Sequence, residues 1–242
     1  MNTDKVDSCI AFLNGHNSPN WNTVVDRLKP GSHLAAICPL LNHHSITMAI
    51  EDCGIEIRDC IMVLGKPSYM VSLGRVPLEG TVAENVLRYG TGALNIDGCR
   101  VGTETRYNTP ASPTSASRKS RVVAGYRNDA GTGPGSSGSI VTGRWPANCI
   151  LGGDYDFAFP QSSSNAKPRN RNPKLDREQW RMGGKQYNDT TEYGDKGSAA
   201  RFFYHVKGHD KVDELVKYLV KLINPPGGKV LFLGSTRYNE HQ

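Results

Sequence analysis

Apolar positions in the first third of the chain alternate between strand-like runs and helical spacing. Residues 6–13 (VDSCIAFL) form a short apolar run, which is typical of a buried strand. Residues 20–29 show the i, i+3, i+4, i+7 spacing of a helix with one buried face, and Pro30-Gly31 is expected to end it. The four apolar positions of this helix are Trp21, Val24, Val25 and Leu28.

The same alternation continues along the chain. Residues 33–39 have the length of a strand, residues 42–53 predict a second helix that ends near Gly54, and residues 55–64 predict another strand. Strands that alternate with helices are typical of crossover units. We therefore expect an α/β fold, with a sheet built from such units.

Regular patterns return near the C-terminus. Residues 200–207 predict a strand, and residues 211–223 (KVDELVKYLVKLI) predict the clearest helix of the chain. The sequence NPPGG at 224–228 is expected to stop this helix, and residues 229–234 predict a buried strand.

Two polar segments, 103–142 and 161–197, separate these patterns and enclose an apolar island at 143–152. The net charge of +6 originates in this part of the chain, because residues 100–185 carry 14 Lys and Arg against 6 Asp and Glu, whereas the remainder carries 15 against 17. A basic, Arg-rich segment with interspersed aromatic residues suits a phosphate backbone. A solvated loop without a partner explains the charge equally well.

Basic residues in these segments are candidate phosphate contacts to double-stranded DNA, with surface solubility as the alternative. They are Arg118, Lys119, Arg121, Arg127, Arg169, Arg171 and Arg177. Trp145 and Trp180 are candidates for stacking on bases, although packing is the preferred interpretation for Trp145.

Five blocks of the sequence, at 28–37, 49–62, 77–102, 143–150 and 198–207, precede or accompany the C-terminal helix, PPGG turn and strand. In these blocks and in their order, the chain resembles phage and prophage members of the DNA amino-methyltransferase family, which acts on adenine N6 or cytosine N4. The resemblance implies a Rossmann-like methyltransferase sheet formed by 1–77 and 198–242. It also implies that 78–197 is an inserted, target-recognition-like region rich in Gly, Ser and Arg.

The family carries a (D/N/S)PP(Y/F) loop after the strand that matches 6–13. There, a polar side chain accepts a hydrogen bond from the amine of the flipped target base, and an aromatic residue stacks on it. The resemblance places Phe12, Leu13, Asn14 and Gly15 at these positions. The side chains of Phe12 and Leu13 cannot accept hydrogen bonds, so we expect no catalytic residue here. Asn14 would supply an acceptor only if the register slipped by two residues.

The family binds S-adenosylmethionine with an FxGxG loop after the methyl-donor strand. Phe232 and Gly234 match this loop, Thr236 replaces its last glycine, and Lys211 matches a lysine that precedes the last helix. These three matching residues are the candidate cofactor contacts, but the incomplete loop favours a protein without a cofactor. The sequence at 224–227, NPPG, lacks the aromatic residue of a catalytic loop and is interpreted as a helix stop.

Cysteines and histidines suggest no metal site. The six cysteines form no CxxC pair and are expected to be small buried residues. The side chains of His43 and His44 diverge by about 100° on a helix, so neither is assigned a role. No run approaches the roughly 18 apolar residues of a membrane span. Because no secretory signal is visible, we expect a cytoplasmic protein, in the host cytoplasm if phage-encoded.

The leading interpretation is a pseudo-methyltransferase that binds DNA or a protein partner, as a phage protein or as the non-catalytic partner of an active subunit. The first alternative is an active S-adenosylmethionine-dependent DNA methyltransferase, with Asn14 as the acceptor and Phe12 or Trp21 stacking on the base. The second is a structural component of a larger assembly, including a homo-oligomer.

The DNA-contact hypothesis predicts the effect of reversing three charges. Changing Arg118, Lys119 and Arg121 together to Glu should weaken duplex binding and flatten its dependence on salt, because fewer counterions are released. Fluorescence anisotropy over a salt series measures both quantities, and an unchanged affinity and slope would remove the assignment.

Overall fold

The computed structural model describes residues 5–13, 18–108, 139–153, 155–163, 196–207 and 211–234, and the structural statements concern these residues. The chain forms two compact units. The larger unit comprises Met1–Gly153 together with Phe202–Gln242, and the smaller comprises Asp154–Arg201. The boundaries of the inserted region that the resemblance implied, at 77 and 198, stay a prediction. The large unit also includes strands from the block at 143–152.

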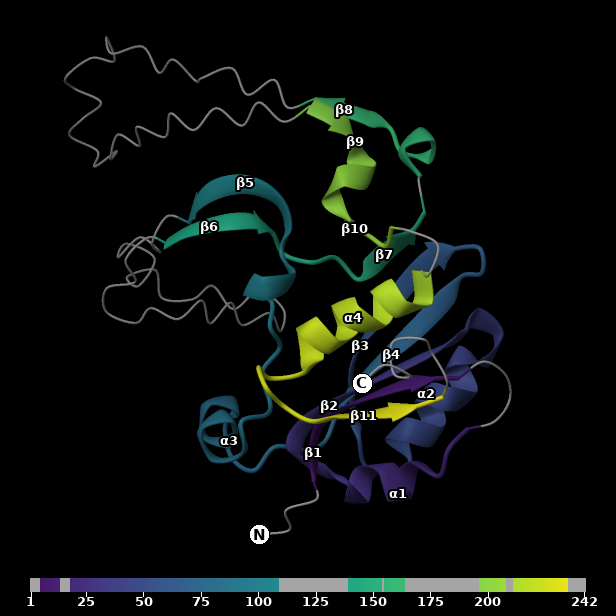
Figure 1. Cartoon of the computed structure of the whole chain (residues 1–242), viewed down its shortest axis with the longest axis vertical. Helices are drawn as coiled ribbons and strands as arrows, with labels where there is room; N and C mark the ends of the chain where they lie inside the picture. The colour runs from purple at the N-terminus through teal and green to yellow at the C-terminus, as the bar shows by residue number, and fades with distance from the viewer. Residues whose placement is uncertain are drawn as a thin grey trace, which may run out of the picture. The chain divides into compact units, whose positions relative to one another are not determined.

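A seven-stranded mixed sheet forms the centre of the large unit, in the order β10-β7-β3-β4-β2-β1-β11 (Figure 1). All neighbouring strands are parallel except β4, which is antiparallel to both β2 and β3. The strands are β1 (Val6–Phe12), β2 (Leu28–Pro39), β3 (Glu56–Gly65), β4 (Tyr69–Arg75), β7 (Cys149–Gly152), β10 (Tyr204–His205) and β11 (Val230–Leu233). With the helices that connect these strands, the sheet confirms the predicted α/β class.

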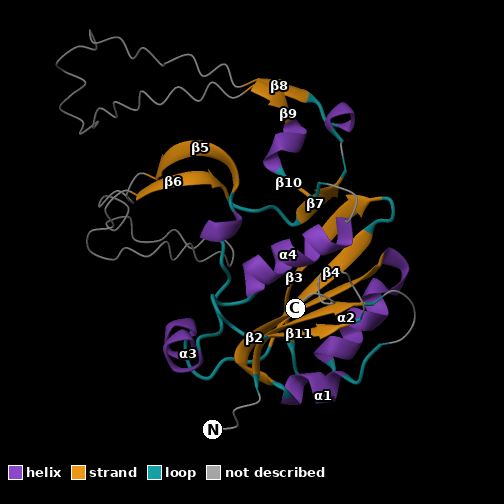
Figure 2. Cartoon of the chain, viewed as in Figure 1, coloured by secondary structure: helices purple, strands orange, loops and turns teal. Residues whose placement is uncertain are grey.

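Helices pack on both faces of this sheet (Figure 2). The α-helices are α1 (Trp21–Asp26), α2 (His43–Glu51), α3 (Val82–Tyr89) and α4 (Lys211–Ile223). Successive strand residues point to opposite faces, so Ile10 packs with α4 whereas Cys9 and Ala11 pack with α1 and α2. Two hydrophobic cores result, called here the α4 core and the α1/α2 core.

Shorter elements complete the described part of the chain. The β5 (Val101–Asn108) and β6 (Ser139–Arg144) strands form an antiparallel pair in the large unit, and β8 (Gln161–Ser163) and β9 (Lys196–Ser198) form another in the small unit. The 3-10 turns are η1 (Leu40–Asn42), η2 (Asp97–Cys99), η4 (Asp156–Ala158) and η6 (Ala199–Phe202). Among the described residues, no helix is long and apolar enough to cross a bilayer.

Three predicted elements differ from the structure by more than two residues at one end. The first helix ends at Asp26, and β2 runs through the expected stop at Pro30-Gly31. A register shift between β1 and β2 at this point accommodates Pro30, which lacks an N–H, and Gly31, whose φ is 75°. The strand predicted at 200–207 is only two residues long, because the chain first forms the 3-10 turn η6.

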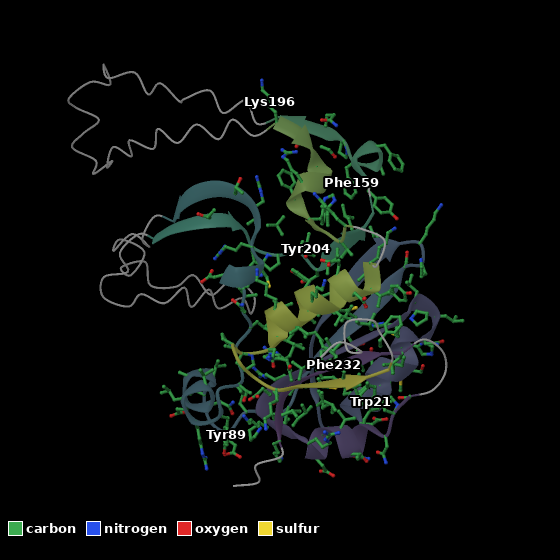
Figure 3. The ribbon with its side chains drawn as sticks, in the orientation of Figure 1. Trp21, Tyr89, Phe159, Lys196, Tyr204 and Phe232 are labelled. Atoms are coloured by element: carbon green, nitrogen blue, oxygen red, sulfur yellow. The ribbon has the colours of Figure 1, made fainter. Side chains whose placement is uncertain are left out.

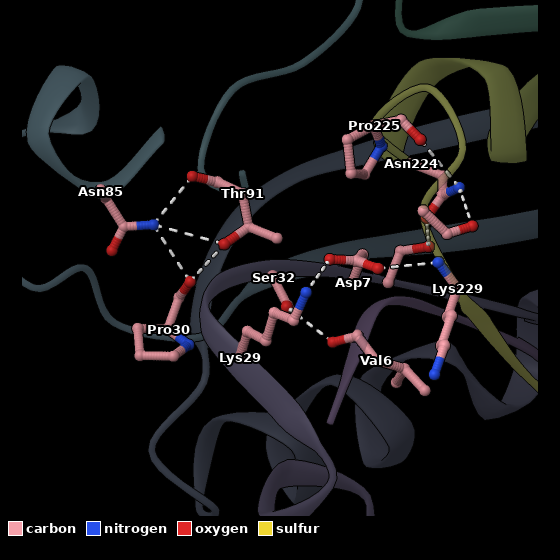
Figure 4. Close-up of polar contacts among 12 residues, drawn as sticks. Val6, Asp7, Lys29, Pro30, Ser32, Asn85, Thr91, Asn224, Pro225 and Lys229 are labelled. Carbon is pink, nitrogen blue, oxygen red and sulfur yellow. Dashed lines mark hydrogen bonds and ion pairs between the residues drawn. The ribbon is translucent and has the colours of Figure 1, made fainter. Parts of the chain in front are cut away.

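A cluster of polar contacts surrounds the start of β1 (Figure 4). The buried Asp7 carboxylate accepts hydrogen bonds from Lys29 Nζ at 2.5 Å and from the backbone N–H of Lys229 at 2.7 Å. The Ser8 hydroxyl donates to Asn224 Oδ1 at 2.7 Å. These contacts connect β1 to the beginnings of both its neighbours, β2 and β11, at the edge of the sheet where the parallel strands start.

A fully buried asparagine anchors α3 (Figure 4). Asn85 Nδ2 donates to the carbonyl oxygens of Pro30 at 3.0 Å and Thr91 at 2.8 Å, while its Oδ1 accepts from the backbone N–H of Glu79 at 3.0 Å. Gly31 allows the close approach, since a Cβ there would lie 2.3 Å from Asn85 Nδ2. Backbone groups of three segments therefore depend on one side chain.

Substituting Asn85 with Ala should lower the free energy of unfolding by about 2–4 kcal/mol, because it leaves buried backbone groups without partners. Urea denaturation measures this change. The exposed Leu87→Ala on the same helix is the control and should change stability by less than about 0.5 kcal/mol. Equal effects of the two substitutions would contradict the anchoring role.

Candidate functional site

The candidate site lies at the edge of the sheet where β1, β2 and β11 end. In open α/β sheets, ligands bind at the carboxyl ends of the parallel strands. The register pairs Ala11 with Leu233 and Phe12 with Ile37, so the segments that follow β1 and β11 are neighbours. The resemblance assigns the catalytic loop and the methyl-donor loop to these same segments.

Phe12 and Leu13 are packing residues in this structure. The Phe12 ring contacts the Tyr69 ring edge-on, with centroids 5.7 Å apart, and packs against the α4 core. Leu13 is buried in the α1/α2 core, and its backbone N–H donates to the carbonyl of Ile37 at 2.8 Å. Asn14 and Gly15, the other two positions of the degenerate loop, lie outside the described residues.

Gly234 is in contact with the backbone of Phe12. Its φ is 87°, and a Cβ at this position would lie 2.2 Å from the carbonyl oxygen of Phe12. No other residue type fits without displacing the end of one strand. Phe232, two residues earlier, is partly buried against the α4 core (Figure 3). Close packing of two strand ends thus accounts for both matches to FxGxG.

Lys211 is the first residue of α4 and is exposed. The other end of α4 reaches the start of β1, because Asn224, which follows Ile223, binds Ser8. With a helix rise of 1.5 Å per residue, the first turn of α4 therefore lies toward the carboxyl edge of the sheet. Lys211 and Gly234 therefore both lie toward the carboxyl ends of the parallel strands. No described contact joins the two residues.

The family's pocket for S-adenosylmethionine can be compared with the described residues only in part, because 14–17 and 235–242 lie outside them. Holding the donor requires a glycine-lined approach and an acidic residue. A Cβ at Gly234 would meet the Phe12 carbonyl, so the packing of the two strand ends already requires a glycine here. The described residues that directly follow β1, β2 and β11 are Leu13, Leu40 and Gly234, and none carries a carboxylate. We therefore assign no chemical step to the described residues at this edge.

The NPPG sequence lies at the opposite edge and has a structural role. The α4 helix ends at Ile223, as predicted. Asn224 Nδ2 donates to the carbonyl oxygens of Pro225 at 3.1 Å and Gly228 at 3.0 Å. Its side chain therefore holds the turn closed, far from the end of β1.

Other aromatic and basic candidates have mixed outcomes. The seven basic residues proposed to contact phosphate, and Trp180, lie outside the described residues. Packing was the preferred interpretation for Trp145, and it is wrong for most of this side chain, which is 66% exposed. The neighbouring Arg144 guanidinium lies 4.0 Å from the centroid of the Phe202 ring. The sequence alone did not indicate this contact, because the two residues are far apart in the chain.

The sequence alone also did not indicate a contact between the His43 imidazole and the Cys60 thiol. His43 Nε2 lies 3.3 Å from Cys60 Sγ and 3.3 Å from the Thr47 hydroxyl. Burial lowers the pKa of His43 and raises that of the Cys60 thiol, so both groups favour their neutral forms. Neutral partners suit packing better than nucleophilic chemistry.

The cysteines are free thiols. Burial raises the pKa of Cys9 to about 12 and of Cys38 to about 11, which keeps both protonated. The prediction of small buried residues is confirmed for Cys9, Cys38 and Cys99, whereas Cys53, Cys60 and Cys149 are only half-buried. Within the described ranges, no three His, Cys, Asp or Glu side chains are grouped to hold a metal ion.

Comparisons with other proteins give little further information. No family model and no curated protein matches the chain. Among solved structures, the chain is similar to the crystal structure of the M1.HpyAVI–SAM complex, with 14% identity and a TM-score of 0.26. The similarity covers 30% of this chain and 45% of that one, less than half of its length. The α/β assignment therefore rests on the strand order and pairing themselves.

Two glycine substitutions test the contact between the strand ends. Gly227 and Gly234 both have a positive φ, but a Cβ at Gly227 meets nothing within 4 Å. Gly227→Ala should cost about 1–2 kcal/mol from its backbone conformation. Gly234→Ala should cost about 1–3 kcal/mol more, because the methyl group meets the Phe12 carbonyl. Urea denaturation compares them, and equal costs would contradict the close contact.

Proposed function

We propose that this chain is a methyltransferase-like protein that does not transfer methyl groups and acts by binding double-stranded DNA. The observation that supports the absence of methyl transfer is the packing of Phe12 and Leu13. Phe12 stands where the resemblance requires a polar acceptor, and its side chain packs against the α4 core. Leu13 stands at the first proline position and is buried in the α1/α2 core.

Methyl transfer to an exocyclic amine needs an acceptor that holds the amine and a residue that stacks on the flipped base. Phe12 already contacts Tyr69, so its ring is engaged in packing. Trp21, the other stacking candidate for an active enzyme, is buried in the α1/α2 core. Supplying either ring to a base would require removing it from a hydrophobic core, at a cost of about 2–3 kcal/mol for the ring alone.

The DNA-binding half is supported by the distribution of charge. The basic surplus lies between residues 100 and 185, and part of it falls between β5 and β6, which are paired strands of the large unit. Arg118, Lys119, Arg121 and Arg127 belong to this connection in the sequence. Lysine and arginine in such numbers favour a polyanion, since each phosphate contact releases counterions.

Two measurements on the full chain test the proposal separately. Isothermal titration with S-adenosylmethionine should show no binding, and unmodified duplex DNA should acquire no label from a methyl-tritiated donor. An active amino-methyltransferase serves as the positive control. Labelled methyl groups on DNA would overturn the inactive assignment.

Duplex binding is followed by fluorescence anisotropy in a salt series. The affinity should fall steeply as salt increases. An absence of binding at low salt would overturn the DNA-binding half while leaving the inactivity result intact.

A further inference from the structure

An exposed indole directly follows β6. Trp145 is 66% accessible, whereas tryptophan is highly buried on average in folded proteins. Trp21, which is 3% exposed in the α1/α2 core, shows the usual placement. The ring of Trp145 therefore contributes little to the core and is accessible to another molecule.

Contacts on both sides of Trp145 fix the backbone that presents it. Gly143 has a φ of 80°, and a Cβ there would lie 2.8 Å from a carbonyl oxygen of β5. The buried Pro146 restricts the residue before it to extended conformations. Asn148 Nδ2 donates to the Asp59 carboxylate at 2.7 Å. Because the backbone is already ordered, a ligand that binds the ring has a smaller entropy cost to overcome.

The surroundings of Trp145 suit a nucleobase better than a protein. Its exposed neighbours in the sequence are Thr142, Ala147 and Asn148, which are small or polar. An energetically important residue of a protein interface is normally surrounded by further contacts that exclude water. A base needs only one flat aromatic face to stack on, together with cations for its phosphate backbone.

Positive charge lies on the same pair of strands. Arg144, the last residue of β6, directly precedes Trp145, and its guanidinium is held 4.0 Å from the centroid of the Phe202 ring. In the sequence, the connection between β5 and β6, residues 109–138, carries four Lys and Arg against one Asp. Such a segment favours a polyanion, because each phosphate contact releases counterions.

One DNA strand can reach the connection and the indole together. The register pairs Asn108 with Ser139 at the end of the strand pair where the connection leaves, and Val101 with Arg144 at the other end. From Ser139 to Arg144, β6 extends about 17 Å, at about 3.4 Å per residue. Nucleotides of one DNA strand are also about 3.4 Å apart, so the two ends are about five nucleotides apart.

We propose that Trp145 stacks on an unpaired base of DNA whose phosphates contact the basic connection between β5 and β6. This inference rests on the proposed DNA binding and adds the form of DNA that binds most tightly. Every base has a flat aromatic face, so stacking requires no particular sequence. Drawing a base out of a duplex costs unstacking energy, and this cost is smallest where the base has no partner. A duplex with an unpaired base should therefore bind more tightly than a fully paired one.

Fluorescence anisotropy with two labelled DNAs tests the stack. One is a fully paired duplex, and the other is the same duplex with one extra, unpaired base. Trp145→Ala should bind the second DNA about 5- to 150-fold more weakly than the natural chain, which corresponds to the loss of one base–aromatic stack. Its affinity for the fully paired duplex should not change. Trp145→Phe keeps a ring and should lose less than Trp145→Ala.

Phe157→Ala is the matched control, because Phe157 is also an exposed aromatic residue, 86% accessible, in the basic part of the sequence. It should bind both DNAs as the natural chain does. Indole emission gives a second readout, since the DNA with the unpaired base should quench it in the natural chain and less in Trp145→Phe. Circular dichroism confirms that each variant is folded, and Trp145→Phe decides the question if Trp145→Ala is not.

The outcomes separate the stack from DNA binding itself. Equal affinity of the natural chain for the two DNAs, equal losses in Trp145→Ala and Phe157→Ala, or unchanged quenching in Trp145→Phe would overturn the stack and leave the DNA-binding function in place. A folded Trp145→Ala that binds as the natural chain does would also overturn it, and would leave the indole to a protein partner. No binding of either DNA at low salt would overturn both proposals.

Discussion

The buried carboxylate of Asp7 is the constraint on which the large sheet depends. A buried charge is costly unless it is paired and hydrogen-bonded. Asp7 finds its partners in Lys29, at the start of β2, and in the backbone N–H of Lys229, just before β11. The central strand β1 is therefore satisfied only when both neighbours are in place. Strands β1, β2 and β11 therefore form one cooperative unit. The candidate site lies at the carboxyl ends of these strands.

The sequence predicted the elements whose apolar pattern is local and complete. The helix predicted at 211–223 and α4 have the same bounds, and β1 and β11 lie within the predicted runs. The strand order could not be predicted in the same way. β4 inserts antiparallel between β2 and β3, and this depends on tertiary pairing that hydrophobic periodicity does not encode. The extension of β2 through Pro30 depends likewise on a shift in register with β1.

At the candidate site, too, local features could be predicted from the sequence, whereas contacts between distant segments could not. The sequence was sufficient to show that Phe12 and Leu13 cannot accept hydrogen bonds through their side chains. It did not show that Phe12 contacts Tyr69, or that the Phe12 carbonyl occupies the space beside Gly234, because both contacts join distant segments. The α3 helix was not predicted, and the exposure of its apolar residues Val82, Val86 and Leu87 depends on the distant backbone contacts of Asn85.

The pairing of β1 with β11 also has a consequence for how the protein is made. Asp7 and Lys229 are separated by 222 positions in the chain, yet they hydrogen-bond directly. At about 5–20 residues per second, a ribosome needs about 10–45 s to produce the second partner after the first. During this time the apolar β1 has one flank open, so the nascent chain passes through a stage at which a chaperone has a strand edge to shield.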